Sequence, residues 1–367
     1  MAERQATTRP SLAAVLCLTL FFLFVCSLIF VIPYQRWSMN PAYFFEAIGN
    51  RFEQLYLFIT GQSGDFAVTV YQYIAVMLAG SALACCGAVF QGGFRNVLAG
   101  PSTMGVMSGG TLGLMIYLLF YSPSATSTTL QAWAQRGFFE IFAQQLITLA
   151  GCIAGVGLVL AVATAAGRGR LSATAMILSG TVFSTLTGNA AQLLQYYLIL
   201  TDPTDPRIDA IRNLVMGSFV NITSWRHILM MAIPILLCLA IMLRLRYRME
   251  LFSLNDDEAL ASGVNVRRLR YAIVAAGSVL TAVVIAFCGH IGFLGFMIPL
   301  IGRRICGPQM AKLLPASILL GAIVLVVVYD AAYIAGLQDY INVFTSAIGG
   351  FTLLLALLRK GGARRAA

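Results

Sequence analysis

Charge is scarce in this sequence. Only 10% of its 367 residues are Asp, Glu, Lys or Arg, and 59% are hydrophobic, whereas a soluble globular protein carries about 25% charged residues. The mean hydropathy of +0.84 agrees with this imbalance. Such a composition excludes a water-soluble enzyme, a disordered chain and a secreted disulfide scaffold. It predicts an all-α polytopic membrane protein made of a single transmembrane domain over residues 1–367.

Nucleotide-binding and metal-binding motifs are also missing. Neither of the two lysines, Lys312 and Lys360, follows a glycine, so no GxxxxGK[ST] loop can hold the phosphates of ATP. No HExxH, EF-hand or Rossmann pattern occurs. The eight cysteines form no CxxC pair, and most lie in apolar runs, which favours small buried hydrophobes over metal ligands or disulfides. We therefore expect no catalytic residues, no metal site and no cofactor bound by this chain.

Uncharged stretches long enough to cross a bilayer recur along the chain. A crossing needs about 20 residues. The first stretch follows two arginines, as a signal peptide would, but it is long and ends without a clear cleavage site, so we interpret it as a retained span. Ten spans are predicted: residues 10–35, 66–94, 101–121, 141–167, 171–201, 227–243, two spans within 271–302 separated by a glycine turn, 313–335 and 340–358.

The basic residues predict the orientation. Ten spans put both termini on one side of the membrane. The loops on the opposite side hold six of the 24 Lys and Arg residues, which leaves 18 on the side of the termini; the six are Arg36, Arg51, Arg136, Arg207, Arg212 and Arg226. Cytoplasmic loops are enriched in Lys and Arg, so both termini are predicted to be cytoplasmic. This bias also removes the need for a nucleic-acid partner.

Two loops are long, an outer one at about 34–66 and an inner one at about 244–270. The inner loop is the most charged stretch of the chain and predicts a short helix. Asn255 is a candidate N-cap, acidic residues at 256–258 suit the positive end of the helix, and Gly263 ends it. A capped helix on the cytoplasmic face is suited to docking another protein. The alternative is a solvated amphipathic loop.

Ionisable residues within the predicted spans are few. Asp330 lies near the outer end of the ninth span and is interpreted as structural. His290 lies in the glycine turn; it could be a ligand, but a hydrogen-bonded structural histidine is the favoured interpretation. An ion-coupled secondary carrier or channel would need more such groups along its pathway, so it remains the alternative function. A membrane enzyme would need a catalytic constellation, which is absent from the sequence.

Glycines recur at four-residue spacing in two stretches. They are Gly105, Gly109 and Gly113 in one and Gly151 and Gly155 in the other. Small residues at this spacing let two membrane helices approach closely. We expect these faces to pack spans within one subunit.

A series of short motifs occurs in one order along the chain. They are Ala79–Leu83, Gly87–Gly92, Arg95-Asn96, Leu98-Ala99, Pro101, Gly105-Val106, Ser108-Gly109, Ile177–Gly180, Met216–Ser218, Ser224-Trp225, residues 254–266, Gly289, Ile291–Phe293, Gly295, Pro299, Arg303, Leu313–Pro315, Asp330, Thr345 and Gly349. From about residue 66 to 360 this order resembles the FecCD-type permease subunits of type II ATP-binding-cassette (ABC) importers. That family takes up iron-siderophores, heme and cobalamin.

The resemblance implies a dimeric assembly in the bacterial cytoplasmic (inner) membrane. Two permease subunits would surround the pathway, with two ATPase subunits that bind ATP-Mg below and an extracytoplasmic substrate-binding protein above. This chain would be a non-catalytic, multi-pass subunit. Iron-siderophore import is favoured because it is the commoner use of the family.

The resemblance also assigns sites. It places an inner gate at Ser172, Ala173 and Thr174. It places contacts with the ATPase at Leu254, Asn255, Asp256, Asp257, Glu258, Ala259, Leu260, Gly263, Val264 and Asn265.

The chain departs from the family where binding-protein docking is expected. The family's outer arginines are replaced by Thr69, Gln72 and Ile334. In the family these arginines contact carboxylates of the binding protein. Either a different permease subunit retains them in a heterodimer, which is slightly favoured over a homodimer, or other outer cations have taken over. The candidate cations are Arg51, Arg207 and Arg212. Smaller departures are Val97, Leu300 and Tyr340, where the family has proline, histidine and proline.

Overall fold

The protein is described from a computed structural model. The structure describes residues 12–27, 53, 56, 65–120, 137–167, 173–250 and 266–352, and these contain helices and no strand. The helices are α1 (Leu12–Cys26), α4 (Asp65–Gly93), α5 (Val106–Phe120), α7 (Phe138–Ala166), α8 (Ala173–Thr201), α9 (Pro206–Met216), α10 (Trp225–Met249), α12 (Val266–Cys288), α13 (Leu294–Cys306) and α14 (Met310–Ile334). A further helical stretch covers 341–352.

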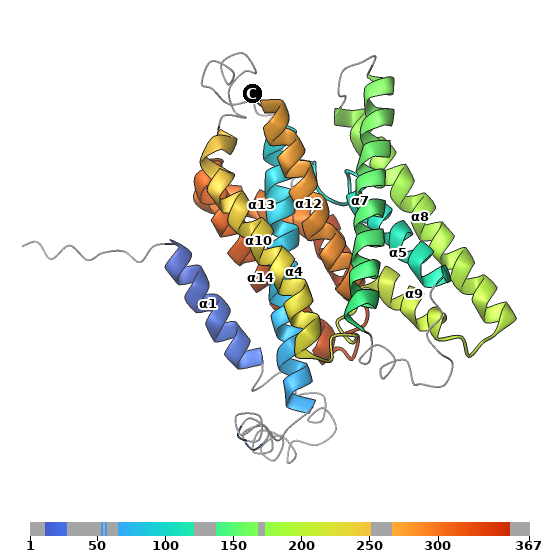
Figure 1. The fold of residues 1–367 in the computed structure, drawn as a ribbon. Coiled ribbons are helices and arrows are strands. Elements are labelled where there is room, and N and C mark those ends of the chain that lie inside the picture. The colour runs from blue at the N-terminus through green and yellow to red at the C-terminus, as the bar shows by residue number, and fades with distance from the viewer. Residues whose placement is uncertain are drawn as a thin grey trace, which may run out of the picture.

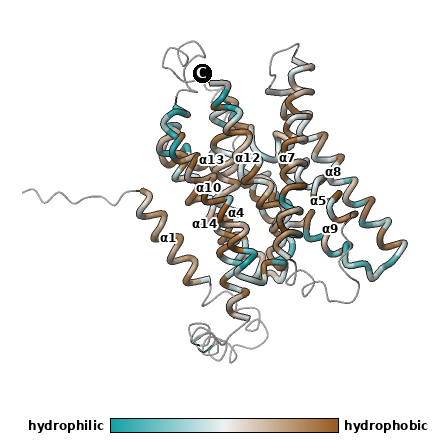
Figure 2. The backbone as a smooth tube through the Cα atoms, in the orientation of Figure 1, coloured by the Kyte–Doolittle hydropathy of each residue, from teal (hydrophilic) through white to brown (hydrophobic). Residues whose placement is uncertain are grey.

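Five of the described helices are long and apolar enough to cross a membrane: α4, α7, α10, α12 and α14. The shorter apolar helices α1 and α5 lie where two further spans were predicted. Helix α8 is as long as α4 but is not among the five, since polar residues recur along it. Figure 2 shows the hydrophobic residues along the helices, with hydrophilic residues at the upper end of α10 and in the turn that joins the lower end of α8 to α9. The prediction of an all-α, multi-pass membrane protein is confirmed.

Helix α4 is the centre of the bundle. It contacts α14, α12, α13 and α10 (Figure 1). Of the residues in its most apolar 18-residue stretch, 78% are buried inside the protein. Two glycines make these contacts possible. A Cβ at Gly80 would meet the carbonyl oxygen of Gly321 in α14, and a Cβ at Gly87 would meet the carbonyl of Gly295 in α13. Backbones that approach this closely gain dispersion energy that larger side chains would prevent.

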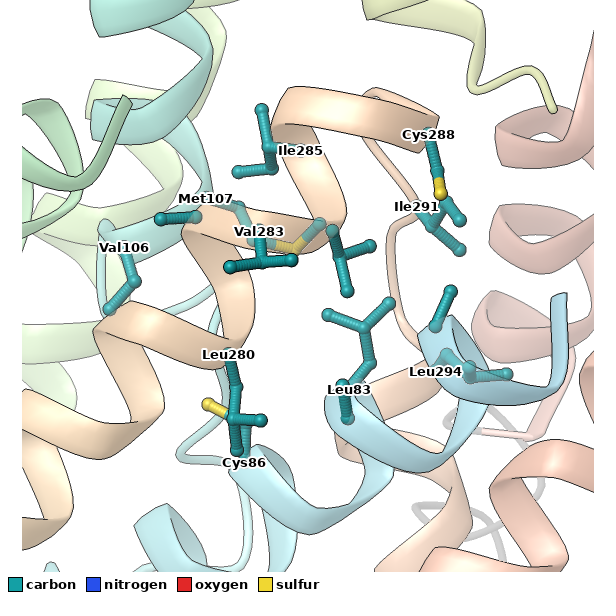
Figure 3. Packing of buried hydrophobic residues seen from close by; sticks show 14 of the residues in the cluster. Leu83, Cys86, Val106, Met107, Leu280, Val283, Ile285, Cys288, Ile291 and Leu294 are labelled. Carbon is teal, nitrogen blue, oxygen red and sulfur yellow. The ribbon is translucent and has the colours of Figure 1, made fainter. Parts of the chain in front are cut away.

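The interior between α4, α5 and α12 is filled by interlocking apolar side chains. Leu83 and Cys86 of α4, Met107 of α5, and Leu280 and Val283 of α12 are at most 4% exposed (Figure 3). The cysteines of this region behave as the small buried hydrophobes that the sequence predicted.

The predicted glycine faces pack α5 against α7. A Cβ at Gly155 would lie 2.8 Å from the Cα of Gly109, and a Cβ at Gly151 would lie 2.9 Å from the Cα of Gly113. The expectation of close packing within one subunit is confirmed.

The ends of four helices meet on the upper side in Figure 1. Arg270 in the first turn of α12 donates from Nε to the carbonyl oxygen of Gly93 at the end of α4 (3.1 Å). Glu250, which follows α10, accepts from the amide of Ala311 in the first turn of α14 (2.8 Å). Arginines gather here, which agrees with a cytoplasmic upper side. They are Arg95, Arg244, Arg246, Arg248, Arg268, Arg303 and Arg304.

Three features differ from the sequence prediction: one connection, the length of one helix and the presence of another. Helix α10 extends to Met249 and α12 begins at Val266, so the inner connection is shorter than the predicted 244–270. Helix α13 has 13 residues, about 20 Å at 1.5 Å per residue, and is too short to cross a core of about 30 Å alone. The outer helix α9 was not predicted, because its mixed composition has no apolar run. It begins with Asp205 as N-cap and Pro206 in its first turn.

Candidate translocation pathway

One face of α8 is polar and exposed. Thr181, Thr185, Asn189, Gln192 and Tyr196 are spaced three or four residues apart, so they lie on one side of the helix, and all five are exposed. We call this set the α8 polar stripe. Polar side chains on a membrane helix usually face water, another subunit or a cavity. The stripe is therefore the candidate wall of a passage.

The α8 polar stripe offers hydroxyl and amide groups and no formal charge. The sequence of α8 contains no Asp, Glu, Lys, Arg or His. Thr181 and Thr185 donate their hydroxyls to the carbonyls of Leu178 (2.9 Å) and Thr181 (3.0 Å), which lowers the cost of placing them at membrane depth. Such a wall can line a water-filled passage without binding an ion strongly.

An apolar groove adjoins the stripe. It encloses about 360 Å³ between α7 and α8 and is lined by residues that include Leu158, Val162, Leu178, Val182 and Leu186. The middle of α10 is different, because the residues exposed between Leu229 and Ile241 are all apolar; they include Leu229, Ile233, Leu236, Leu237 and Ile241. That pattern indicates a lipid-facing surface, whereas α8 presents both kinds of face.

A further feature of the bundle is a broken helix, and α9 contacts both α8 and the first half of this broken helix. Helix α12 stops at Cys288, and α13 begins at Leu294. In between, Gly289 (φ 72°) and Phe293 (φ 61°) adopt left-handed backbone conformations. Helix α13 begins inside the bundle, since a Cβ at Gly295 would lie 2.8 Å from the carbonyl oxygen of Leu83 in α4. Irregular backbone within a membrane protein occurs only where protein or a water-filled cavity covers it.

The broken segment is tied to the outer elements by backbone groups. The amide of His290 donates to the carbonyl of Leu214 in α9 (2.7 Å), and that of Ser218 donates to the carbonyl of Cys288 (3.0 Å). Asn342 joins both, because its Oδ1 accepts from Gly292 (2.9 Å) and its Nδ2 donates to Val215 (3.1 Å). These bonds satisfy the freed backbone groups of the turn, as a low-dielectric environment demands.

The side chain of His290 lies within hydrogen-bond distance of α5. Its Nδ1 lies 3.4 Å from the Thr111 hydroxyl oxygen. That hydroxyl already donates to the carbonyl of Met107 (2.9 Å), so the neutral imidazole donates from Nδ1 and keeps its lone pair on Nε2. The geometry supports the structural interpretation of His290.

Asp330 bonds three helices together. Its carboxylate accepts from Ser27 Oγ (2.5 Å), which directly follows α1, and from Tyr73 Oη in α4 (2.6 Å). Sequence reasoning placed Asp330 in a structural role but did not find its partners, which are 303 and 257 residues away. These bonds support the structural interpretation.

Two of the positions that replace the family's outer arginines can be compared, and one of them has a polar contact within the chain. The Oε1 of Gln72 accepts from Tyr329 Oη (3.2 Å), so its amide links α4 to α14. Ile334 is 42% exposed and apolar.

The candidate docking cations already have carboxylate partners. Arg207 bonds Asp205 through Nε (2.9 Å to Oδ2), and this guanidinium holds the pKa of Asp205 below its ordinary value. Arg212 lies 3.0 Å from Asp209 with both side chains 47% exposed, so that pair is weak. Arg51 lies outside the described residues.

The predicted inner sites remain predictions. Ala173 and Thr174 open α8, and their side chains, like Ser172, are outside the described part of the chain. The predicted contacts with the ATPase, residues 254–265, also lie outside it. The helices that flank them end on the arginine-rich side, which is where a cytoplasmic coupling loop has to begin and end.

The α8 polar stripe was missed from the sequence. A signal was present, since its members recur with helical spacing in the predicted fifth span. The absence of charge predicts a span but does not distinguish the faces of its helix, so it could not indicate the stripe.

A bundle with a broken helix and a polar wall defines a class, the multi-pass membrane transport proteins, and comparison with known proteins identifies the chain as a permease subunit of ABC importers. Residues 14–359 match the FecCD transport family. The chain belongs to the FecCD transport family.

Several relatives support this placement. The molybdate import permease MolB of Haemophilus influenzae is 31% identical over 81% of this chain and 82% of its own length. The Fe(3+)-citrate permease YfmE of Bacillus subtilis is 28% identical over 73% of this chain and 75% of its own length. The hemin permease HmuU of Yersinia pestis is 28% identical over 78% of this chain and 80% of its own length. A transporter described as of metal-chelate type, solved in an inward-facing conformation, is similar with a TM-score of 0.68, 26% identity, and coverage of 95% and 99%.

Proposed function

We propose that this chain forms part of the central pathway of an importer that carries an iron-siderophore across the bacterial inner membrane. The observation that carries the proposal is the exposed α8 polar stripe. It provides an uncharged, wettable wall at membrane depth, which a purely lipid-facing bundle would not need. A wall without charge also suits a large chelate that must be released.

Energy would come from separate subunits. The sequence has no phosphate-binding loop, so ATP-Mg binds to two partner ATPases. The predicted coupling loop at 254–265 transmits their movement to α10 and α12. An ion-coupled carrier is less well supported, because Asp330 is engaged by Ser27 and Tyr73.

Molybdate is the second candidate substrate. The similarity to the molybdate permease of Haemophilus influenzae favours it. An uncharged wall is compatible with either substrate, since selectivity can reside in the binding protein that delivers it.

One reconstitution tests both the coupling and the substrate. Vesicles containing the complete importer should accumulate a radiolabelled iron-siderophore only with ATP. Gly263→Pro should reduce uptake by about tenfold or more, because proline cannot adopt the left-handed conformation expected at the end of the coupling helix. ATP-dependent uptake of molybdate but not of iron chelate would reassign the substrate. Uptake without ATP, driven by an ion gradient, would contradict the assignment as an ATP-driven importer.

The heterodimer can be tested by purification. We expect the tagged chain, isolated from its native host, to bring a second, different permease subunit that retains the outer arginines. The reason is that Gln72 serves a helix contact and both described candidate cations have carboxylate partners within this chain. A complex that contains only this permease chain together with its binding protein would contradict the heterodimer.

A further inference from the structure

The outward face of α10 changes from apolar to basic near its inner end. Ile233, Leu237 and Ile241 are exposed on this face. Arg244 and Arg248 are also exposed and continue the same face, because they follow at spacings of three and four residues. The change is visible in Figure 2 at the upper end of α10. We call Arg244 and Arg248 the α10 arginine pair.

The length of the apolar part of this face matches a membrane. Arg226 is exposed at the start of α10 and lies on the same side of the helix. From Arg226 to Arg244 the helix rises about 27 Å at 1.5 Å per residue, and the hydrocarbon core of a bilayer is about 30 Å thick. The α10 arginine pair is therefore placed at the depth of the phospholipid headgroups of the inner leaflet.

Aromatic residues support this depth. Trp225 at the start of α10 is 56% exposed, and Tyr247 near its end is 63% exposed. Exposed Trp and Tyr concentrate at the two membrane–water interfaces. Arg246 holds Tyr247 in place, because its Nη2 donates to Tyr247 Oη (2.9 Å) and its guanidinium lies 4.8 Å from the centre of that ring.

The α10 arginine pair is available to a ligand. Both side chains are exposed, and neither has a hydrogen bond or an ion pair within the part of the chain that the structure describes. The inner ends of the described helices contain one carboxylate, that of Glu250, and it accepts from the amide of Ala311 (2.8 Å). The positive charge of the pair is thus left for a partner outside the chain.

The spacing of the pair favours one phosphate group as that partner. Arg244 and Arg248 are one turn apart, about 6 Å along the helix, and two like charges at this spacing repel each other. Both guanidinium groups can reach a single phosphate between them, and arginine–phosphate hydrogen bonds are strong because both groups are charged. The apolar face directly below the pair requires that this phosphate be joined to a hydrocarbon chain.

We propose that the α10 arginine pair binds the phosphate of an anionic phospholipid of the inner leaflet, of the phosphatidylglycerol class. The acyl chains of this lipid lie along Leu237 and Ile241. A zwitterionic lipid fits less well, because its own cation lies beside the phosphate and is repelled by the pair. The bound lipid would hold the inner end of α10, from which the chain continues to the predicted coupling loop at 254–265.

The test is fluorescence quenching on the full chain, reconstituted into phosphatidylcholine vesicles at low salt. Ile241→Trp places an indole on the apolar face next to the pair, and lipids brominated on their acyl chains quench it when they lie beside it. The signal is the difference from the parent chain. Brominated phosphatidylglycerol should occupy this place about 25-fold better than brominated phosphatidylcholine, because each arginine near an anionic lipid contributes about fivefold.

The variants are made in the Ile241→Trp chain. Arg244→Gln and Arg248→Gln should each lower the preference for phosphatidylglycerol about fivefold. Arg212→Gln is the matched control, because it removes the same charge from an exposed arginine that lies 3.0 Å from Asp209 on the outer helix α9. It should leave the preference unchanged.

Two results would overturn the proposal. Equal quenching by the two brominated lipids would show that the pair faces water or a protein partner. A preference that Arg212→Gln lowers as much as Arg244→Gln and Arg248→Gln do, in variants that elute as the folded chain, would show a general effect of charge. The vesicles contain this chain alone, so the outcome is independent of the proposed import function.

Discussion

Thr185→Trp and Asn189→Trp should each reduce ATP-driven uptake by about tenfold or more while the chain remains folded. Both residues belong to the exposed α8 polar stripe. A bulky indole there would narrow the passage and remove the hydroxyl or amide that keeps the wall wet. The change is on the surface of the subunit and leaves the core intact, so the effect should fall on transport and not on stability. Uptake into vesicles and thermal stability in detergent measure the two separately.

Leu237→Trp is the matched control for the stripe. Leu237 is 61% exposed in the apolar middle part of α10, so lipid should tolerate the same indole there. Normal uptake by both stripe variants would show that the stripe does not line the pathway. A loss of uptake in the Leu237 variant would show that added bulk on any outer face disturbs the importer.

Gly155→Leu should prevent the stable folding of the bundle. Already a Cβ at Gly155 would lie 2.8 Å from the Cα of Gly109 and would also meet the carbonyl of Gly105. Backbone atoms cannot turn aside as a flexible side chain can, and Gly151 against Gly113 holds the same pair of helices together one turn away. Overpacking a well-packed core costs about 1–3 kcal/mol, and separating α5 from α7 should exceed that range. We expect the melting temperature in detergent to fall steeply or the chain to aggregate.

Gly157→Leu gives the comparison on the same helix. A Cβ at Gly157 would meet nothing within 4 Å, so leucine there should leave the melting temperature close to that of the parent chain. Helix propensity changes in the same direction for both substitutions. Equal melting temperatures for the two variants would therefore contradict the tight α5–α7 contact.

Much of the membrane architecture was predictable because its signals are local. A run of apolar residues about 20 long has to leave water wherever it occurs, which is why the predicted spans overlap α4, α7, α10, α12 and α14. This local signal fails for helices that are not apolar and for apolar helices that are too short to cross the membrane. Helix α9 has no apolar run, and α13 is broken off inside the bundle by the turn that begins at Gly289.

The candidate sites also divide into features with a local sequence signal and features that depend on packing. The four-residue glycine spacing predicted a close helix contact, but no spacing tells which helix will be the partner. Gly80 and Gly321 are in close contact, although neither belongs to a four-residue glycine repeat that would predict it.

By itself the sequence determined that the chain is a helical membrane protein, which side its arginines favour, and that it has no phosphate-binding loop for ATP. These properties follow from composition and from sequence patterns a few residues long, which do not depend on how the helices pack. Only the tertiary structure decided that Asp330 is bonded by Ser27 and Tyr73, that Gln72 contacts Tyr329, and which face of α8 stays exposed. Those outcomes depend on how helices far apart in the chain pack, because a polar group's role is set by the partner that packing brings to it.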